Sequence, residues 1–170
     1  GSVLYFYGGR VANGALSNEF LSFNMKTFEF TEVVASSAGR PSPRYYHAAA
    51  LHGSANSRMI IMGGLTTTSS NERQNSIFMF EFKAFAWLPI VNANPILPRS
   101  HFTMNFDVAM QEVVIVGGFS SHTLLDKYKL KATQIPNDQA RDAWNVSFTK
   151  LPIDDTGLRT RQLMRGEHTT

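Results

Sequence analysis

Cysteine is absent from all 170 residues of the chain. This absence excludes disulfides, thiolate zinc sites and a cysteine nucleophile, and it is typical of proteins in a reducing compartment. We therefore expect an intracellular protein, in the cytoplasm, with the nucleus or an organelle matrix as alternatives. Long apolar runs are also absent, since no stretch reaches the roughly 18 residues that a membrane-spanning helix needs. The first residues do not resemble a secretory signal, so neither membrane insertion nor secretion is predicted.

Charged residues are scarce, at 17% of the chain. Soluble domains average about 25%, so the shortage indicates that much of the surface is covered by other protein. The net charge of +3 is spread along the chain, and no run of five Lys or Arg occurs. Nucleic acid is therefore not an indicated partner. In contrast, hydrophobic residues make up 43% of the chain and Phe occurs 13 times, a composition that favours strands.

The main positive signal is a repeat in which a short apolar run ends in a pair of glycines. Three such runs occur: Val3–Gly9, Met59–Gly64 and Val113–Gly118. Their glycine pairs are spaced 55 and 54 residues apart, close to the ~50 residues of a Kelch repeat. Because each run is apolar at successive positions, we expect a strand with both faces buried between neighbouring sheets.

Further strands are predicted at matching places in each repeat. Third strands are expected at 18–23, 75–80 and 125–130, and fourth strands at 28–33 and 85–89. Phe30 and Trp87 each lie seven residues beyond an aromatic residue of the third strand, whereas the third repeat reaches Trp144 only after an insertion. First strands are expected at 43–49 and 98–104, each entered through a Pro-Arg pair that contains Arg44 or Arg99.

This order of elements resembles the Kelch family. The resemblance implies an all-β fold, a fragment of a Kelch-type β-propeller built from four-stranded antiparallel blades. The expected parts are a partial blade at 1–35, a complete blade at 36–92, a complete blade at 93–153 with an insertion near 131–142, and a tail or first strand of a further blade at 154–170. Since three blades would leave apolar faces bare at both ends, we expect the remaining blades to come from the same polypeptide or another chain.

Most of the notable residues are expected to be structural. The repeat positions are Gly8, Gly9, Gly63, Gly64, Gly117, Gly118, Phe30, Trp87, Trp144, Arg44 and Arg99. The aromatic residues of the strands are interpreted as packing residues. Arg44 and Arg99 are interpreted as residues that order the turn between blades, and the alternative for these two is that they bind a peptide carboxylate. His47 and His101 fall in the first strands and have no further ligands at metal-binding spacing, so no metal or other cofactor is predicted.

The loops that follow the glycine pairs are the candidate binding surface, because a rigid propeller leaves its loops free to vary. Three such loops from adjacent blades are expected on one face, with side chains suited to an acidic or polar peptide. The candidate partner-binding residues are Arg10, Asn13, Asn71, Arg73, Ser120, Ser121 and His122. The alternative is that these loops are ordinary solvated turns.

The resemblance implies a non-enzymatic scaffold or adaptor that binds protein partners. No phosphate-binding loop, nucleophile elbow or paired zinc-ligand motif appears in the sequence, so no catalytic residue is predicted. Kelch-like enzymes remain the alternative reading. An oxidase resembling galactose oxidase needs a cysteine and is excluded within this segment, whereas a sugar mutarotase-like activity, or a propeller attached to a phosphatase, stays open.

Overall fold

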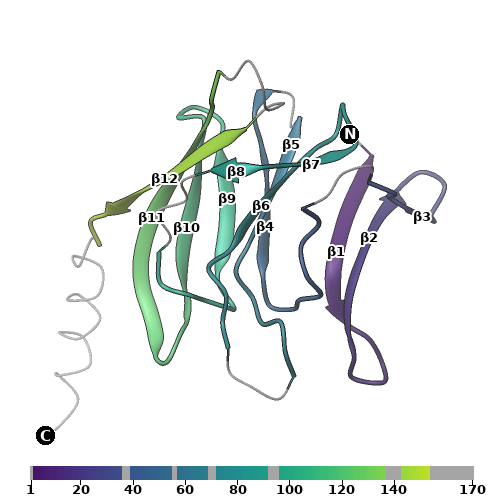
Figure 1. Cartoon of the computed structure of the whole chain (residues 1–170), viewed down its shortest axis with the longest axis horizontal. Coiled ribbons are helices and arrows are strands. Elements are labelled where there is room, and N and C mark those ends of the chain that lie inside the picture. The colour runs from purple at the N-terminus through teal and green to yellow at the C-terminus, as the bar shows by residue number, and fades with distance from the viewer. Residues whose placement is uncertain are drawn as a thin grey trace, which may run out of the picture.

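The computed structural model describes residues 2–35, 39–54, 57–68, 72–91, 96–136 and 143–153. These residues form three β-sheets that stand side by side, in chain order from right to left in Figure 1. The first sheet contains β1 (Val3–Arg10), β2 (Leu16–Asn24) and β3 (Glu29–Glu32). The second contains β4 (Ala48–His52), β5 (Arg58–Met62), β6 (Ile77–Glu81) and β7 (Ala86–Leu88). The third contains β8 (Ile90–Val91), β9 (Thr103–Asp107), β10 (Glu112–Phe119), β11 (Thr123–Gln134) and β12 (Trp144–Leu151).

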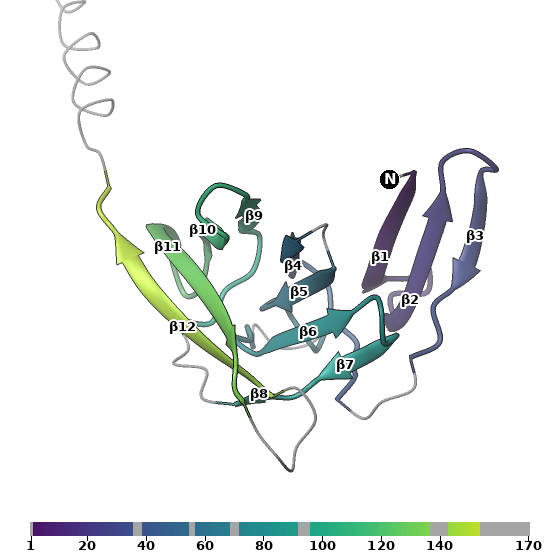
Figure 2. The same cartoon turned by 90° about the horizontal axis from the view of Figure 1, so that it is seen from above.

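Neighbouring strands pair antiparallel in the order of the chain, as expected for propeller blades, with one exception. The short β8 follows β7 in the chain but does not join the second sheet. It pairs parallel with the start of β12 in the third sheet. Seen from above, the sheets form an arc in which β1, β4 and β9 lie toward the inside and β3, β7 and β12 toward the outside (Figure 2). The predicted all-β fold of antiparallel blades is thereby confirmed.

Two apolar cores hold the sheets together, one at each junction. Between the first and second sheets, Tyr7 and Phe20 pack with Ile61, Phe80 and Trp87. Between the second and third sheets, alternate residues of β5 and β6 pack against β10, β11 and β12; this core includes Ile60, Met62, Met79, Val113, Ile115, Leu130, Trp144 and Val146. Because side chains alternate along a strand, β5 contributes one set of residues to each core.

Burial on both faces holds for β5 but not for the other two glycine-pair strands. Met59, Ile60, Ile61 and Met62 are all buried. In β1, by contrast, Leu4 and Phe6 are almost half exposed, and in β10 Val116 is exposed. The expectation does not hold for β1 and β10 because, among the described residues, each has a neighbouring sheet on one side only.

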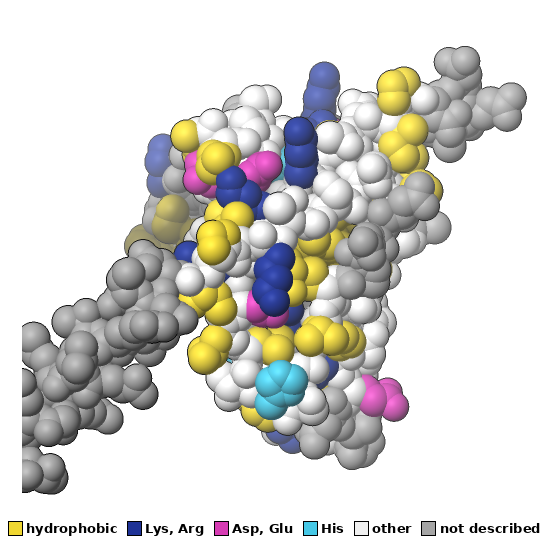
Figure 3. Space-filling model, turned by 90° about the vertical axis from the view of Figure 1, so that its left-hand side faces the viewer, with side chains coloured by type: hydrophobic (Ala, Val, Ile, Leu, Met, Phe, Trp, Pro, Cys, Tyr) yellow, Lys and Arg dark blue, Asp and Glu magenta, His cyan; other side chains and the backbone are white. Residues whose placement is uncertain are grey.

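The two outer faces of the arc also differ in chemistry. The outer face of the first sheet is aromatic: Phe6, Phe23 and Phe30 are in ring contact, and Phe30 is 62% exposed. On the third sheet, the residues of β11 that face away from buried Leu130 include the exposed Leu125 together with Lys127, Lys129 and Lys131. Figure 3 shows basic and apolar side chains mixed on this side of the molecule. The expected apolar outer face is therefore found on the first sheet, whereas the outer face of the third sheet is mixed, with lysines beside the exposed Val116 and Leu125.

Strand register corrects two details of the predicted repeat. Phe80 pairs with Trp87, and the matching residue Leu130 pairs with Phe148, so Phe148 holds the place of Trp87 in the third sheet. Trp144 lies four residues earlier, buried beneath the guanidinium of Arg58 at 4.4 Å. The first strands begin at Ala48 and Thr103 rather than at Pro43 and Pro98, because Tyr46 and His101 have φ near +55°, which interrupts an extended strand.

Candidate functional site

A repeated arginine contact joins each sheet to the next. The backbone of Arg44 bonds to the first sheet: its N–H donates to Ser17 O and its carbonyl accepts from Gly9 N. Its guanidinium reaches instead into the second sheet, where it donates to Gly63 O at 2.8 Å and to Ser76 Oγ at 3.1 Å. We call this contact an arginine bridge.

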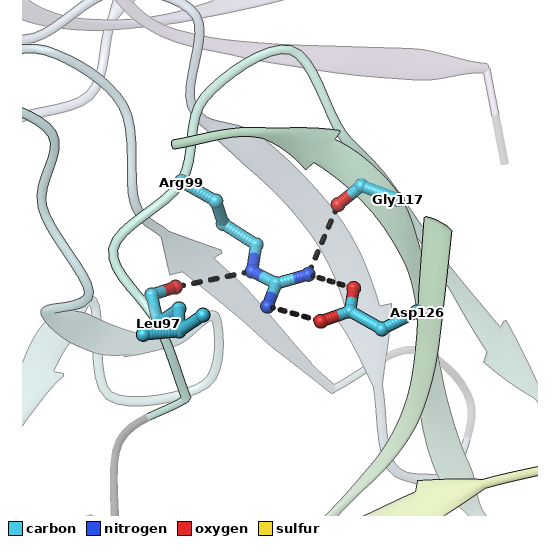
Figure 4. Close-up of polar contacts among 4 residues, drawn as sticks. All are labelled: Leu97, Arg99, Gly117 and Asp126. Carbon is cyan, nitrogen blue, oxygen red and sulfur yellow. Dashed lines mark hydrogen bonds and ion pairs between the residues drawn. The ribbon is translucent and has the colours of Figure 1, made fainter. Parts of the chain in front are cut away.

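Arg99 forms the second arginine bridge, between the second and third sheets. Its backbone bonds to Gln74 O and Gly64 N, and its guanidinium donates to Gly117 O at 3.0 Å and to both carboxylate oxygens of Asp126 at 2.7 and 3.1 Å (Figure 4). Arg44 and Arg99 are 1% and 0% exposed, and their guanidinium groups lie over the rings of Phe78 and Tyr128. Burial lowers the pKa of Arg44 from its usual value. These contacts support the interpretation that both arginines order the junctions between blades.

The glycine pairs allow the backbones to approach each other at these bridges. A Cβ on Gly64 would lie 2.6 Å from Tyr45 O and 2.9 Å from the Cβ of His47, and Gly64 has φ of +88°. Gly118 has the same relation to Phe102, whose Cβ lies 2.8 Å from the position of an added Cβ. His47 and Phe102 therefore occupy equivalent places, and His101 matches Tyr46 rather than His47.

His47 is held as a neutral imidazole among these groups. Burial, and secondarily the positive charge of Arg44, lower the pKa of His47 to about 4. Its ring lies edge-on to Tyr7, with centroids 6.0 Å apart. Within the described residues no cluster of His, Asp or Glu has the arrangement of a metal site. His47 is thus a packing residue of the junction.

Next to the second arginine bridge, polar loop residues surround a surface hollow. This hollow, of about 460 Å³, is lined by Arg73 and Pro98 and by Phe119, Ser120 and Ser121 of the third repeat. A second hollow of about 540 Å³ shares Arg73 and Phe119 and extends to His101. The guanidinium of Arg73 lies over the Phe119 ring at 4.5 Å, and its Nε donates to Ser100 Oγ at 3.2 Å. Two loops that are distant in sequence therefore form one surface.

Stacked rings continue this surface toward the inside of the arc. The Tyr46 and His101 rings lie 3.7 Å apart between centroids, and the Tyr45 and Tyr46 rings 4.5 Å apart. Tyr46 is 51% exposed, and the His101 N–H donates to Tyr46 O. Both Tyr46 and His101 have left-handed backbones, a conformation that is uncommon for residues other than glycine and that clusters at binding sites. We call the surface formed by Tyr46, Arg73, His101, Phe119, Ser120 and Ser121 the junction surface.

The structure brings together only part of the predicted partner-binding set. Arg73, Ser120 and Ser121 line the same hollow, and His122 adjoins it through a contact of its Nδ1 with Ser121 Oγ at 3.1 Å. Arg10 and Asn13 lie in the β1–β2 hairpin, where Arg10 Nε donates to Gly14 O and Asn13 Oδ1 accepts from Ala15 N. This hairpin lies at the lower edge of the first sheet in Figure 1 and contributes no lining residue to either hollow. Asn71 lies outside the described residues.

Sequence reasoning did not select Tyr46, His101 or Phe119 for binding. Aligning the two entry segments on Arg44 and Arg99 would have shown that Tyr46 and His101 share the second position after the arginine. No sequence signal identifies Phe119, because its role depends on the loop of the preceding repeat folding over it.

The described part of the chain holds no helix with the length and apolarity of a membrane span. Comparison with known proteins agrees with the geometry. Over 120 residues, 69% of its length, the chain is 27% identical to dynein regulatory complex subunit 7 of Chlamydomonas reinhardtii, of which it covers 10%. The solved structure of YjhT, a Kelch propeller, matches 88% of the chain with a TM-score of 0.59 at 12% identity, and the chain covers 43% of that structure. The family model of the KLHDC2/KLHL20/DRC7 Kelch-repeats domain matches residues 1–142, and the chain belongs to this family.

Proposed function

We propose that the chain is a protein-interaction module that recognises an acidic or polar segment of a partner protein at the junction surface. Kelch-repeat domains generally mediate contacts between proteins, and a relative of this chain is named as a subunit of a complex. The observation that carries the proposal is the hollow in which Arg73, Phe119, Ser120 and Ser121 meet from two neighbouring repeats.

The chemistry of the junction surface favours such a ligand. The guanidinium of Arg73 supplies positive charge, and the hydroxyls of Ser120 and Ser121 are short donors and acceptors at the rim. Phe119 and the Tyr46–His101 pair supply flat apolar surface, which is the kind of group that dominates protein interfaces. A carboxylate together with a neighbouring apolar side chain would match both features.

Site-specific photo-crosslinking tests the location. A photoreactive residue placed at Ser121 should capture the partner, whereas the same residue at Val34, which is exposed beyond β3, should not. The partner is then identified by mass spectrometry and purified. Capture of the same protein with equal yield from both positions would contradict the assignment.

Affinity measurements with the purified partner test the residues. Arg73→Ala should weaken binding by about tenfold or more, because a charge-assisted hydrogen bond contributes roughly 1.5–3 kcal/mol. Because Arg73 also donates to Ser100 Oγ and lies over the Phe119 ring, the unfolding temperature is measured for the same variant, and affinity is compared at a temperature where both proteins are fully folded. Arg10→Ala is the matched control: unchanged affinity places the contact at the junction surface alone, and an equal loss extends it to the β1–β2 hairpin.

A further inference from the structure

One buried serine contacts three residues of the junction surface. Ser100 is 0% exposed, and its backbone exchanges two hydrogen bonds with that of Phe119, at 3.0 and 2.8 Å. Its side-chain oxygen accepts from Arg73 Nε at 3.2 Å and lies 3.0 Å from His101 Nδ1. Ser100 therefore holds the cation, the imidazole and the exposed phenylalanine of the junction surface in place.

The hydrogen bonds of Ser100 determine which nitrogen of His101 carries the proton. A serine hydroxyl has one proton to donate and two lone pairs that accept, whereas arginine only donates. The contact with Arg73 therefore uses a lone pair, and the buried hydroxyl proton still needs an acceptor. Among the described residues, His101 Nδ1 is the acceptor within hydrogen-bond distance of this hydroxyl. Nδ1 is thus unprotonated, and the neutral ring carries its proton on Nε2.

This arrangement leaves a second donor beside the hollow that Arg73 lines. His101 is exposed and lines the hollow of about 540 Å³ together with Arg73. Its ring is fixed by the Ser100 contact at Nδ1 and by stacking on Tyr46 at 3.7 Å, and neither contact uses Nε2. Two N–H donors at one hollow match the two oxygens of a carboxylate.

The first junction shows that this arrangement depends on the serine. Tyr45 is the residue at the equivalent place, directly after the bridge arginine, and exchanges the same two backbone hydrogen bonds with Leu65. The Tyr45 ring stacks on Tyr46 at 4.5 Å, and Leu65 is 5% exposed, whereas its counterpart Phe119 is 38% exposed. A small hydroxyl side chain at position 100 thus distinguishes the second junction from the first.

We propose that Ser100 is the positioning residue of the junction surface, and that it holds His101 so that Nε2–H donates to the same ligand carboxylate as Arg73. The ligand is an aspartate or glutamate side chain of a partner protein, with an apolar neighbour that contacts Phe119. The position of the His101 proton is independent of the proposed function, whereas the shared donation to a carboxylate rests on it.

Nitrogen NMR of the whole chain tests the role of Ser100 without any ligand. At about pH 8, where an ordinary imidazole is neutral, ¹⁵N spectra should show His101 with an unprotonated Nδ1 and a protonated Nε2. Ser100→Ala should move the Nδ1 resonance because the hydrogen bond is lost, and Ser100→Thr, which keeps the hydroxyl, should restore it. Ser76→Ala is the matched control, since it removes a serine that binds Arg44 at the other junction and should leave His101 unchanged.

Affinity for a small probe tests the shared donation. The probe is the capped dipeptide acetyl-aspartyl-phenylalanine amide, and its asparaginyl analogue, which has no carboxylate, is the control ligand. The aspartyl probe should bind more tightly and shift the Nε2 resonance of His101. His101→Phe should weaken its binding by about tenfold or more, because one charge-assisted hydrogen bond is lost. Phe28 and Phe85 already have left-handed backbones in this chain, so phenylalanine is tolerated in that conformation.

Each part of the proposal has a result that would overturn it. A proton on His101 Nδ1, or an Nδ1 resonance that is the same in Ser100→Ala, would show that the serine does not position the ring. Equal affinity of the original chain and His101→Phe for the aspartyl probe would show that His101 does not share the carboxylate. The proposed function fails separately, through crosslinking at Ser121 and the affinity of Arg73→Ala, and neither measurement reports on the His101 ring.

Discussion

At the residue scale, Gly64 and Gly9 separate two effects of a glycine substitution. Both have positive φ, of +88° and +102°, but an added Cβ meets Tyr45 O at 2.6 Å and His47 at Gly64, and nothing within 4 Å at Gly9. Gly9→Ala should therefore lower the free energy of unfolding by roughly 1–2 kcal/mol, the cost of placing a non-glycine residue in a left-handed conformation. Gly64→Ala should lower the free energy of unfolding by roughly 3–5 kcal/mol, because the two sheets must also move apart to make room for the added Cβ. Chemical denaturation measures both, and equal losses would contradict the close approach at Gly64.

His47 predicts how stability depends on pH. Its pKa in the folded chain is about 4, below its ordinary value of 6.5, so unfolding takes up a proton at intermediate pH. The contribution of neutral His47 is fully present above pH 6.5 and is lost as the pH falls toward 4, by about 3 kcal/mol in total. Denaturation curves recorded between pH 7 and pH 4 measure this slope.

His47→Phe is the control for that measurement. Phe102 fills the equivalent place in the next repeat, so the ring should fit, and the variant should have a flatter stability profile between pH 6.5 and 4. An unchanged profile would show that another group causes the dependence; His52, whose pKa is lowered by burial and by Arg58, is the next candidate.

At the element scale, the arginine bridge connects an entry segment to the sheet it enters. Arg99→Met should destabilise the chain by roughly 3–5 kcal/mol, because it leaves the Asp126 carboxylate without its bidentate partner in a mostly buried place. Combining Arg99→Met with Asp126→Leu should recover part of the loss, since no unpaired charge remains. Thermal unfolding of the single and double variants checks this, and a double variant as unstable as the sum of both singles would contradict it.

The elements show how far the sequence alone predicted the fold. The spacing of glycine pairs and aromatic residues was enough to place the three glycine-pair strands and the strands that follow them. It did not reveal where β4 and β9 begin, because the left-handed Tyr46 and His101 are dictated by stacking between repeats. It also misplaced Trp144, since the lengths of β11 and β12 beyond the insertion set the register and put Phe148 opposite Leu130.

The candidate site was predicted in part for the same reason. Arg73, Ser120 and Ser121 were recognisable as polar loop residues after glycine pairs. These three residues share a hollow that Arg10 and Asn13 do not line. Which residues line the hollow depends on the angle between neighbouring sheets. Such contacts between repeats leave no spacing pattern within one repeat.

At the scale of the whole molecule, the aromatic outer face of the first sheet predicts self-association of the isolated chain. Contiguous exposed apolar patches of this kind promote association, and Phe6, Phe23 and Phe30 form one. Phe30→Ser should shift the concentration-dependent mass toward the monomer in sedimentation experiments. Leu125→Ser, on the outer face of the third sheet where Leu125 is 71% exposed, should have little effect. A chain that is monomeric at all concentrations would contradict this prediction.

The parallel pairing of β8 with β12 has a consequence for the order of events during synthesis. The strands of the first two sheets pair with partners close in the chain, so these sheets are complete once β7 has left the ribosome. Val91 must wait for Asn145, its partner in β12, which at 5–20 residues per second arrives roughly 3–10 s later. During that interval the apolar side of β5 and β6 is covered only in part, by β9, β10 and β11 as they are made, so nascent chains are exposed to chaperones and to aggregation until β12 adds Trp144 and Val146 to this core.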